Sequence, residues 1–177
     1  MFMSFEVVQD NITNLNVDAI VNSANKSLIK GSGICKTIYE EAGEKLLDNY
    51  IKENYGDLIL NSGEAIITPG FNLSAKFIIH TVTPKYYIGI REDNIRNFSS
   101  CYVSIIKYAK AYKIKSVAIP CIGNGHHGWP LHESIAILLD TLQWLDCMLD
   151  DDLKIYFVCN TKQQYLNYKG AVSSRRL

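Results

Sequence analysis

The sequence has no surplus of charge of either sign. It contains 18 Lys and Arg against 18 Asp and Glu in 177 residues, so its formal net charge at pH 7 is zero. Proteins that hold nucleic acid or anionic membranes through bulk positive charge need a basic surplus. The composition therefore argues against both kinds of partner. A small anion bound by backbone N–H groups remains compatible with it.

The sequence also lacks the patterns of disulfide frameworks, zinc ribbons and membrane spans. Its five cysteines are odd in number and widely spaced, and none belongs to a C-x-x-C pair. No basic stretch followed by an apolar one marks the first residues as a signal peptide. The longest purely apolar run, Ile135–Leu139, is far too short to cross a bilayer. We therefore expect a reduced, cytoplasmic protein without a membrane partner.

Length and periodicity predict one α/β domain over residues 1–177. A content of 47% hydrophobic and 20% charged residues is ordinary for a globular chain. Strand patterns alternate with helical ones. We expect strands over residues 5–9, 18–22, 64–68, 76–82, 116–122 and 153–159. We expect one helix that begins at residue 34, a second beyond residue 43, two more over residues 95–112 and 131–145, and a last one in the polar tail that follows the final strand. A Pro-Gly turn at Pro69-Gly70 would make the third and fourth strands antiparallel, which predicts a mixed sheet with helices on both faces.

Two glycine-rich segments each follow a strand and precede a helix. They span Asn22–Gly33 and Gly123–Gly128. In open α/β sheets, ligands bind beyond the carboxyl ends of strands, where loops and helix N-termini present N–H donors to anions. Neither segment has the Gly-Lys-Ser/Thr of a Walker loop, and the first lacks the third glycine of a dinucleotide fingerprint. Spacing alone leaves two anion-binding loops and two ordinary turns as alternatives.

Polar residues near these segments suggest further chemistry, each with a structural alternative. Asn22 and Asn25 suit sugar hydroxyls, because amides donate and accept without charge, but Asn also favours turns and caps. His126 and His127, close to Cys121, suggest a metal or a thiol nucleophile, yet adjacent histidines do not share a helix face. We therefore expect neither a metal ion nor a cofactor.

Other notable residues are expected to be structural. His80 lies inside an apolar strand and is interpreted as a core histidine bonded to the backbone. Trp129 and Tyr86-Tyr87 are more typical of packing than of nucleotide stacking. Asp150–Asp152 is typical of a solvated turn.

Taken together, the motifs resemble those of the macrodomain family. The resemblance rests on three segments, Val17–Ile34, Gly63–Pro84 and Ser116–Pro130. The first is similar to the family signature V-D-A-I-V-N-A-A-N…L…G-G-G-V, the second to its central hairpin, and the third to its second phosphate loop, A-x-P-x-I-S-T-G-x-[FY]-G-x-P. The match runs in order over residues 5–160.

The resemblance implies a three-layer α/β/α sandwich around a mixed central sheet of about six strands, with a cleft that binds ADP-ribose. It places the adenine end at Asn11, Ile12 and Asn160, and the distal ribose at Asn25, with Asn22 counted among the binding residues. It assigns the first loop to Gly31, Gly33 and Ile34. It assigns the phosphate-binding second loop to Ile122, Gly123, Asn124, Gly125, His126, His127 and Gly128.

Three positions depart from the family pattern. Asn11 stands where an acidic residue accepts a hydrogen bond from the adenine amino group, and its amide oxygen is a weaker acceptor than a carboxylate. Cys35 stands where one hydrolase branch carries an Asp that helps to activate water. His127 replaces an aromatic residue near the distal ribose. The first change bears on affinity, and the other two bear on mechanism.

The expected function is binding of ADP-ribose with hydrolysis of ADP-ribosyl esters, either mono-ADP-ribose on acidic side chains or O-acyl-ADP-ribose. Asn25 and His127 are the candidate catalytic residues, since Asn25 would orient the distal ribose and His127 would carry a proton near neutral pH. The alternative is a reader module that binds ADP-ribose or an ADP-ribosylated protein without turnover, because Cys35 supplies no general base. The zero net charge disfavours recognition of RNA through the adenine pocket.

Overall fold

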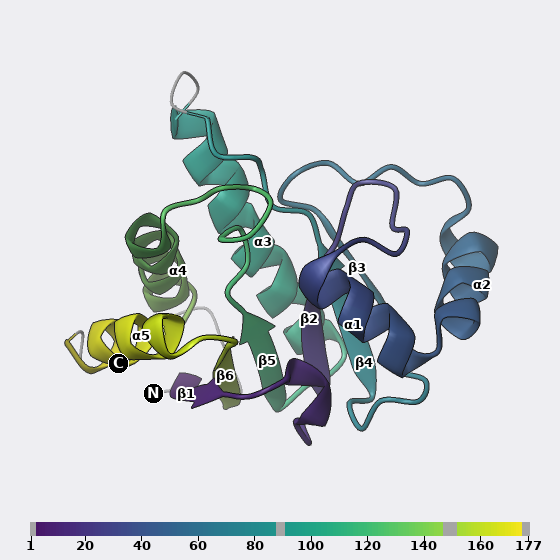
Figure 1. Cartoon of the computed structure of the whole chain (residues 1–177), viewed down its shortest axis with the longest axis horizontal. Coiled ribbons are helices and arrows are strands. Elements are labelled where there is room, and N and C mark those ends of the chain that lie inside the picture. The colour runs from purple at the N-terminus through teal and green to yellow at the C-terminus, as the bar shows by residue number, and fades with distance from the viewer. Residues whose placement is uncertain (1–2, 88–90, 147–151, 175–177) are drawn as a thin grey trace.

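The computed structural model describes residues 3–87, 91–146 and 152–174 (Figure 1). Cys147 and most of the Asp150–Asp152 segment lie outside these residues. In the described parts of the chain, no helix is long and apolar enough to cross a membrane.

Six strands form one mixed sheet in the order β1-β6-β5-β2-β4-β3. Neighbouring strands pair in parallel, except that β3 runs antiparallel to β4 at one edge. The parallel strands all end at the same edge of the sheet, which is where ligands bind in such folds. The bounds are β1 (Met3–Gln9), β2 (Ala19–Ser23), β3 (Ala65–Pro69), β4 (Phe77–Thr81), β5 (Ser116–Pro120) and β6 (Leu153–Cys159).

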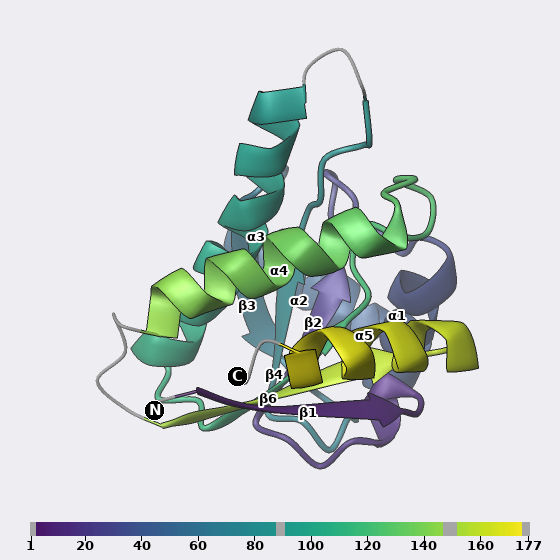
Figure 2. The ribbon, with the colours of Figure 1, turned by 90° about the vertical axis from the view of Figure 1, so that its left-hand side faces the viewer.

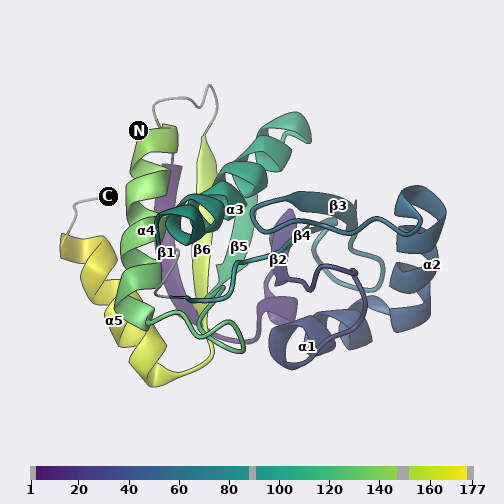
Figure 3. The same cartoon turned by 90° about the horizontal axis from the view of Figure 1, so that it is seen from above.

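In the part of the chain that the structure describes, five α-helices cover the sheet, and Figures 1 and 3 show α1 and α2 on one side and α4 and α5 on the other. Figure 2 shows α5 running alongside β1 and β6. The bounds are α1 (Gly33–Ala42), α2 (Glu44–Tyr55), α3 (Arg91–Ala111), α4 (Leu131–Asp146) and α5 (Lys162–Ser174).

The strands are apolar on both faces because each face packs against helices. Val21 and Ile79 point to the core beneath α3, α4 and α5, whereas their neighbours Ile20 and Ile78 point to the core beneath α1 and α2. Successive strand residues face opposite sides, and burying one such side chain contributes about 1.5–3 kcal/mol. Both faces being covered confirms the predicted three-layer sandwich with its mixed six-stranded sheet.

Asp18 fixes the amino ends of three neighbouring strands. Its Oδ1 atom accepts from Lys76 Nζ at 3.0 Å, just before β4, and its Oδ2 atom accepts from the amides of Lys115 and Ser116 at 3.0 and 3.1 Å. Partial burial alone would raise the pKa of this carboxyl, but these hydrogen bonds lower it below its ordinary value. The carboxylate therefore aligns β2 with β4 and β5, whose far ends carry the candidate site.

The sequence predictions for the elements were close, with the position of one turn shifted. The antiparallel β3–β4 pair exists, but Pro69 is the last residue of β3 and residues 70–76 connect the two strands. Within this loop the Gly70 amide donates to the Lys76 carbonyl at 2.8 Å, and the Leu73 amide donates to the Gly70 carbonyl at 3.0 Å. The helix predicted from residue 95 begins earlier, at Arg91, and the strand predicted to run to residue 122 ends at Pro120.

Candidate functional site

A cavity of about 370 Å³ opens beyond the carboxyl ends of β2, β5 and β6. The loop between β2 and α1 forms one wall, the loop between β5 and α4 forms the opposite wall, and the start of α5 closes one end. The lining residues are Ser23, Ala24, Asn25, Gly31, Ser32, Gly33, Ile34, Cys35, Pro120, Cys121, Gly123, Asn124, Gly125, His126, His127, Asn160 and Gln164. Both glycine-rich segments singled out in the sequence therefore face one cavity.

The cavity wall is polar, but none of its described side chains is a carboxylate, an ammonium or a guanidinium group. Among the described lining residues there is no Asp, Glu, Lys or Arg. Four glycines and two short loops instead bring the backbone to its surface. An anion in this cavity would be held by backbone N–H groups and the start of α1, not by basic side chains.

The first loop is closed on itself by Asn25. Its Nδ2 atom donates to the Ile29 carbonyl at 2.6 Å, and its Oδ1 atom accepts from the Ile29 amide at 3.2 Å. Leu28, at φ 55°, turns the chain inside this loop, and its carbonyl accepts a hydrogen bond from the Tyr39 hydroxyl on α1. Asn25 is thus a loop cap that also lines the cavity, so the two interpretations of this residue do not exclude each other.

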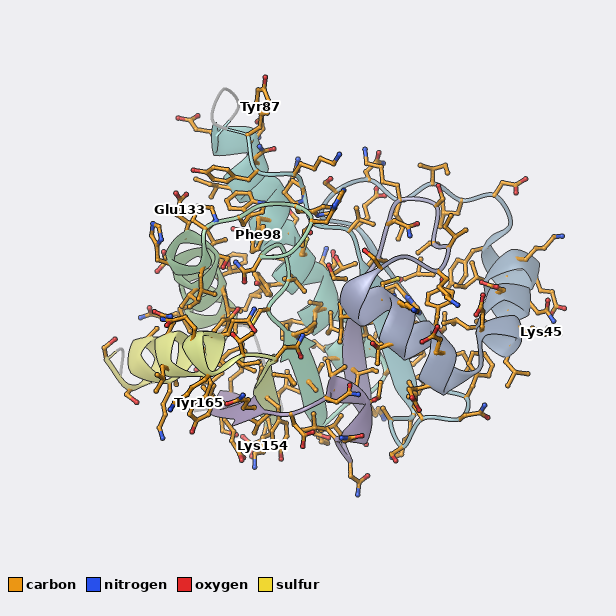
Figure 4. The ribbon with its side chains drawn as sticks, in the orientation of Figure 1. Lys45, Tyr87, Phe98, Glu133, Lys154 and Tyr165 are labelled. Atoms are coloured by element: carbon orange, nitrogen blue, oxygen red, sulfur yellow. The ribbon has the colours of Figure 1, made fainter. Side chains whose placement is uncertain are left out.

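The second loop is anchored at its ends and open in its middle. Gly123 has φ 82°, and a Cβ there would lie 2.4 Å from the Phe98 ring, which Figure 4 labels on α3. The Trp129 amide donates to the Gly123 carbonyl at 3.0 Å, and its indole donates to the Pro84 carbonyl at 2.8 Å. A Cβ on Gly125 would meet nothing within 4 Å, because this residue faces the opening.

The side-chain amide of Asn124 holds the second loop, and contact of its backbone amide with a ligand stays a prediction. Its Nδ2 atom donates to the Trp129 carbonyl at 3.0 Å and to the Ser134 hydroxyl at 2.8 Å. Its Oδ1 atom is buried without a protein partner among the described residues. The side chain therefore ties the loop to the start of α4.

His127 is the titratable residue best placed for proton transfer. It is half-buried, lines the cavity, and forms a hydrogen bond through Nδ1 with the hydroxyl of Thr83, which follows β4. Burial, and the neighbouring charges of His126 and Lys85, lower the pKa of His127 below its ordinary value of 6.5. The expectation that it titrates near 6.5 is therefore corrected downwards, which favours the neutral ring.

His80 is a core histidine, as expected, but side chains rather than the backbone bind it. Its Nδ1 atom lies 3.0 Å from Asn22 Nδ2, and its Nε2 atom lies 3.0 Å from the Thr68 hydroxyl. Complete burial lowers the pKa of His80 to about 3. Asn22 also points Nδ2 at Cys35 Sγ, 3.6 Å away, so a buried polar chain runs from the cavity wall to β3.

The cysteines at the cavity are not activated for fast nucleophilic catalysis. Burial raises the pKa of Cys35, and the hydrogen bond to Cys159, with burial, raises that of Cys121. A thiol nucleophile reacts as the thiolate, which a raised pKa makes scarce. Among the described residues, no three His, Cys, Asp or Glu side chains cluster as metal ligands would.

Five of the predicted binding residues do not line the cavity. The Asn11 side chain caps a short 3-10 helix, Ile12–Asn14, by accepting from the Thr13 amide at 3.2 Å. The other four are Ile12 and Ile122, which are core residues, Asn22, which is buried behind the wall, and Gly128, which turns the second loop. Contacts of these five residues with a ligand stay predictions. The remaining predicted residues do line the cavity.

Several cavity features had no signal in the sequence. Gln164, on α5, closes the adenine end predicted from Asn160, and its Oε1 atom accepts from the Asn160 amide at 3.0 Å. Thr83 lies 44 residues before the histidine that it binds. Such pairings depend on the tertiary fold and leave no local pattern. Ser32 and Cys121, in contrast, lie inside motifs that the sequence had already indicated.

A mixed sheet covered on both faces, with two glycine-rich loops that meet at its carboxyl edge, defines a macrodomain-like α/β/α protein. The Macro domain family model matches residues 21–138. The chain belongs to this family, and the resemblance predicted from the sequence is confirmed.

Similar proteins span nearly the whole chain. A macro domain-containing protein of Ralstonia nicotianae is 34% identical over 174 residues, which cover 98% of this chain and 97% of that one. A Salmonella gallinarum protein named O-acetyl-ADP-ribose deacetylase is 35% identical over 161 residues, covering 90% of this chain and 88% of that one.

Solved structures agree with the fold. The Oceanobacillus iheyensis macrodomain with ADP superimposes with a TM-score of 0.89 at 31% identity, covering 97% of this chain and 91% of that one. The Trypanosoma brucei macrodomain in complex with ADP-ribose gives a TM-score of 0.82 at 28% identity, covering 95% of this chain and 68% of that one.

Proposed function

We propose that this chain binds ADP-ribose in the cavity and hydrolyses ADP-ribosyl esters, either O-acyl-ADP-ribose or mono-ADP-ribose on acidic side chains. The observation that carries the proposal is one cavity between two glycine-rich loops, with a neutral histidine on its wall. A diphosphate flanked by two sugars fits such a site, because backbone N–H groups bind the phosphates and amides bind the hydroxyls. The names of the Salmonella and Trypanosoma proteins support this choice of ligand.

In the proposed reaction, Asn25 orients the distal ribose and water attacks the ester carbonyl. Neutral His127 accepts the proton of the attacking water and returns it to the ribose oxygen that leaves. The lining offers no described carboxylate for this task, which leaves His126, His127 and the substrate phosphates as the bases at hand. We assign the role to His127 because it is half-buried and its Nδ1 atom is bonded to the Thr83 hydroxyl, whereas His126 is exposed. Nε2 of His127 is then the nitrogen that we assign to the substrate.

A specific observation also favours the second candidate, a reader that binds without turnover. Cys35 is 4% exposed, its pKa is raised by burial, and it stands where a carboxylate could otherwise have activated water. In this alternative the cavity recognises ADP-ribose or an ADP-ribosylated protein and releases it unchanged.

The experiment that tests the proposal follows hydrolysis of O-acetyl-ADP-ribose, and of a Glu-linked mono-ADP-ribosylated protein, by wild type and by Asn25→Ala. We expect the wild type to release product. We expect Asn25→Ala to lose at least about ten-fold in kcat but less in affinity, because misplacing the reacting sugar costs rate out of proportion to binding. Loss of the Ile29 hydrogen bonds lowers stability by about 1 kcal/mol, so the variant is assayed well below its melting temperature. Binding of ADP-ribose without product from either substrate would establish the reader.

A further inference from the structure

Two cysteines meet at the floor of the cavity. Cys121 follows β5 directly, and Cys159 is the last residue of β6. Because Pro120 pairs with Val158 in the parallel register, the two next residues stand opposite each other. Their sulfur atoms lie 3.8 Å apart. Cys121 is half-buried and lines the cavity, whereas Cys159 is fully buried behind it.

The register of β5 and β6 predicts a backbone spacing that suits a disulfide. Neighbouring strands lie about 4.8 Å apart, and bridged cysteines have Cα atoms roughly 4.4–6.8 Å apart. An S–S bond is about 2.05 Å long, so the sulfurs must approach each other by a little under half of their present 3.8 Å separation. Of the four cysteines that the structure describes, all are free thiols, and only this pair is in sulfur–sulfur contact.

The hydrogen bond within the pair divides the roles of the two thiols. Cys121 donates its S–H to Cys159 Sγ, which lowers the pKa of Cys159 and raises that of Cys121. The better nucleophile is therefore the buried thiol, and the thiol that a reagent in the cavity can reach is its partner. Access therefore places a first, slow reaction at Cys121, and the lowered pKa of Cys159 favours its attack on the product.

We propose that Cys121 and Cys159 form an oxidation site, at which a small hydroperoxide entering the cavity closes a disulfide that weakens ADP-ribose binding. The effect on ADP-ribose rests on the function proposed above, whereas formation of the disulfide does not.

The chemistry is balanced by the peroxide alone. The sulfur of Cys121 attacks one peroxide oxygen, the O–O bond breaks, and the other oxygen leaves as water after taking a proton, which leaves a sulfenic acid. Cys159 then attacks the Cys121 sulfur, the S–O bond breaks, and the hydroxyl leaves as a second water. Two thiols and one hydrogen peroxide give one disulfide and two waters, so the thiols are oxidised by two electrons and the peroxide is reduced by two.

The bond would alter the second loop because Cys121 is its first residue. Closing the bond turns the Cys121 side chain from the cavity wall toward β6 and constrains the residue that leads into Gly123 and Gly125, which also line the cavity. Phosphate binding through N–H groups depends on donor geometry within a few tenths of an ångström. We expect ADP-ribose affinity to fall by about ten-fold on oxidation.

The first test is chemical. The folded wild-type protein is treated with hydrogen peroxide, and its intact mass and non-reduced peptide map are compared with those of Cys121→Ser, Cys159→Ser and Cys101→Ser. We expect wild type and Cys101→Ser, whose buried thiol lies elsewhere in the core, to lose two hydrogens per chain and to give a 121–159 linked peptide. Absence of this peptide from the folded wild type, or linkage of either cysteine mainly to Cys147, would overturn the proposal.

The second test measures ADP-ribose binding by calorimetry before oxidation, after oxidation, and after reduction by a dithiol. We expect the affinity of wild type to fall and then to recover, and that of Cys159→Ser to be the same in all three states. A mapped disulfide that leaves the affinity unchanged would overturn the regulatory part. If the reduced protein binds no ADP-ribose, the function proposed above fails, and the peptide map still decides whether the oxidation site exists.

Discussion

The hydroxyl of Thr83 is hydrogen bonded to Nδ1 of His127 across two segments that are 44 residues apart in the chain. The amide of Tyr86 donates to the carbonyl of the same histidine at 2.8 Å, and the Trp129 indole donates to the Pro84 carbonyl. The segment after β4 therefore supports the second loop from behind. This support gives the proposed proton carrier a fixed ring orientation before any ligand arrives.

The lowered pKa of His127 sets the pH dependence of hydrolysis. A base works in its neutral form, so the rate is full above the pKa and falls as the pH drops through it. Because the pKa lies below 6.5, we expect kcat/KM at pH 6.5 to stay above half of its plateau and the acid limb to lie at lower pH. His127→Phe should lose most of the rate, and its pH–rate profile should lack the acid limb. The pH–rate profile checks this, and an unchanged limb in His127→Phe would remove the residue from the mechanism.

Removal of the Thr83 hydroxyl should affect rate more than affinity. Thr83→Val keeps the shape of a side chain that is 1% exposed but leaves Nδ1 of His127 without its partner. We expect kcat to fall about ten-fold, through loss of ring orientation, and KM to change little. Thr83→Ser retains a hydroxyl and should restore most of the rate. Equal losses in the Val and Ser variants would indicate a packing role instead.

Gly123 and Gly125 of the second loop should respond differently to substitution. Gly125→Glu places its side chain in open space at the cavity, so it should fold normally while its bulk and negative charge abolish ADP-ribose binding. Gly123→Ala puts Cβ 2.4 Å from the Phe98 ring at φ 82°, and we expect it to lose roughly 2 kcal/mol or more of stability. Thermal unfolding and ligand titration separate the two effects. A normally folded Gly125→Glu that still binds would mean that this loop is only a turn.

Cys35→Asp asks whether the missing carboxylate limits turnover. Position 35 lies in the first turn of α1, where a negative charge is favoured. However, the 4% exposure of Cys35 means that part of the carboxylate would be desolvated, so we expect a loss of about 1–2 kcal/mol in stability. We expect the rate to rise about ten-fold with little change in affinity. Cys35→Asn, similar in size but uncharged, is the matched control, and an equal rise in both would exclude base catalysis.

Burial of His80 should make the free energy of unfolding depend on pH. The pKa of His80 is about 3 in the folded protein, whereas an unfolded histidine titrates near 6.5. Between pH 3 and pH 6.5 the unfolded chain binds a proton at this histidine that the folded chain does not bind. This contribution to the free energy of unfolding is therefore fully present above pH 6.5 and falls with decreasing pH, by at most about 1.4 kcal/mol per pH unit. Denaturant unfolding from pH 7 to 5 should show this slope in wild type and in His126→Gln. His80→Gln should flatten it, and an unchanged slope would assign the effect to other groups.

Much of this molecule could be predicted from its sequence, because the informative patterns are local. Alternation and helical periodicity located the strands and the helices α3 and α4 to within a few residues. The family was indicated by three segments, Val17–Ile34, Gly63–Pro84 and Ser116–Pro130, in each of which the signature residues lie close together in the chain. The predicted turn at Pro69-Gly70 lies one residue early, because β3 includes Pro69, and nothing local reveals how residues 70–76 close the loop.

The site was less accessible to sequence reasoning where it depends on tertiary contacts. The glycines of both loops were predicted and do line the cavity, apart from Gly128. The partners of His80 and His127 were not predicted, since Asn22, Thr68 and Thr83 are distant in the chain and become neighbours only when β2, β3 and β4 pair. The pKa of His127 was misjudged for the same reason, because burial is a property of the folded chain.

The central claim is that the cavity between the two glycine-rich loops is an ADP-ribose site. Calorimetric titration of the reduced protein with ADP-ribose, with AMP as the comparison ligand, tests it most directly. We predict a micromolar dissociation constant, about −8 kcal/mol, and clearly weaker binding of AMP, which lacks the second phosphate and the distal ribose. No heat with ADP-ribose, or equal affinity for the two ligands, would contradict the claim.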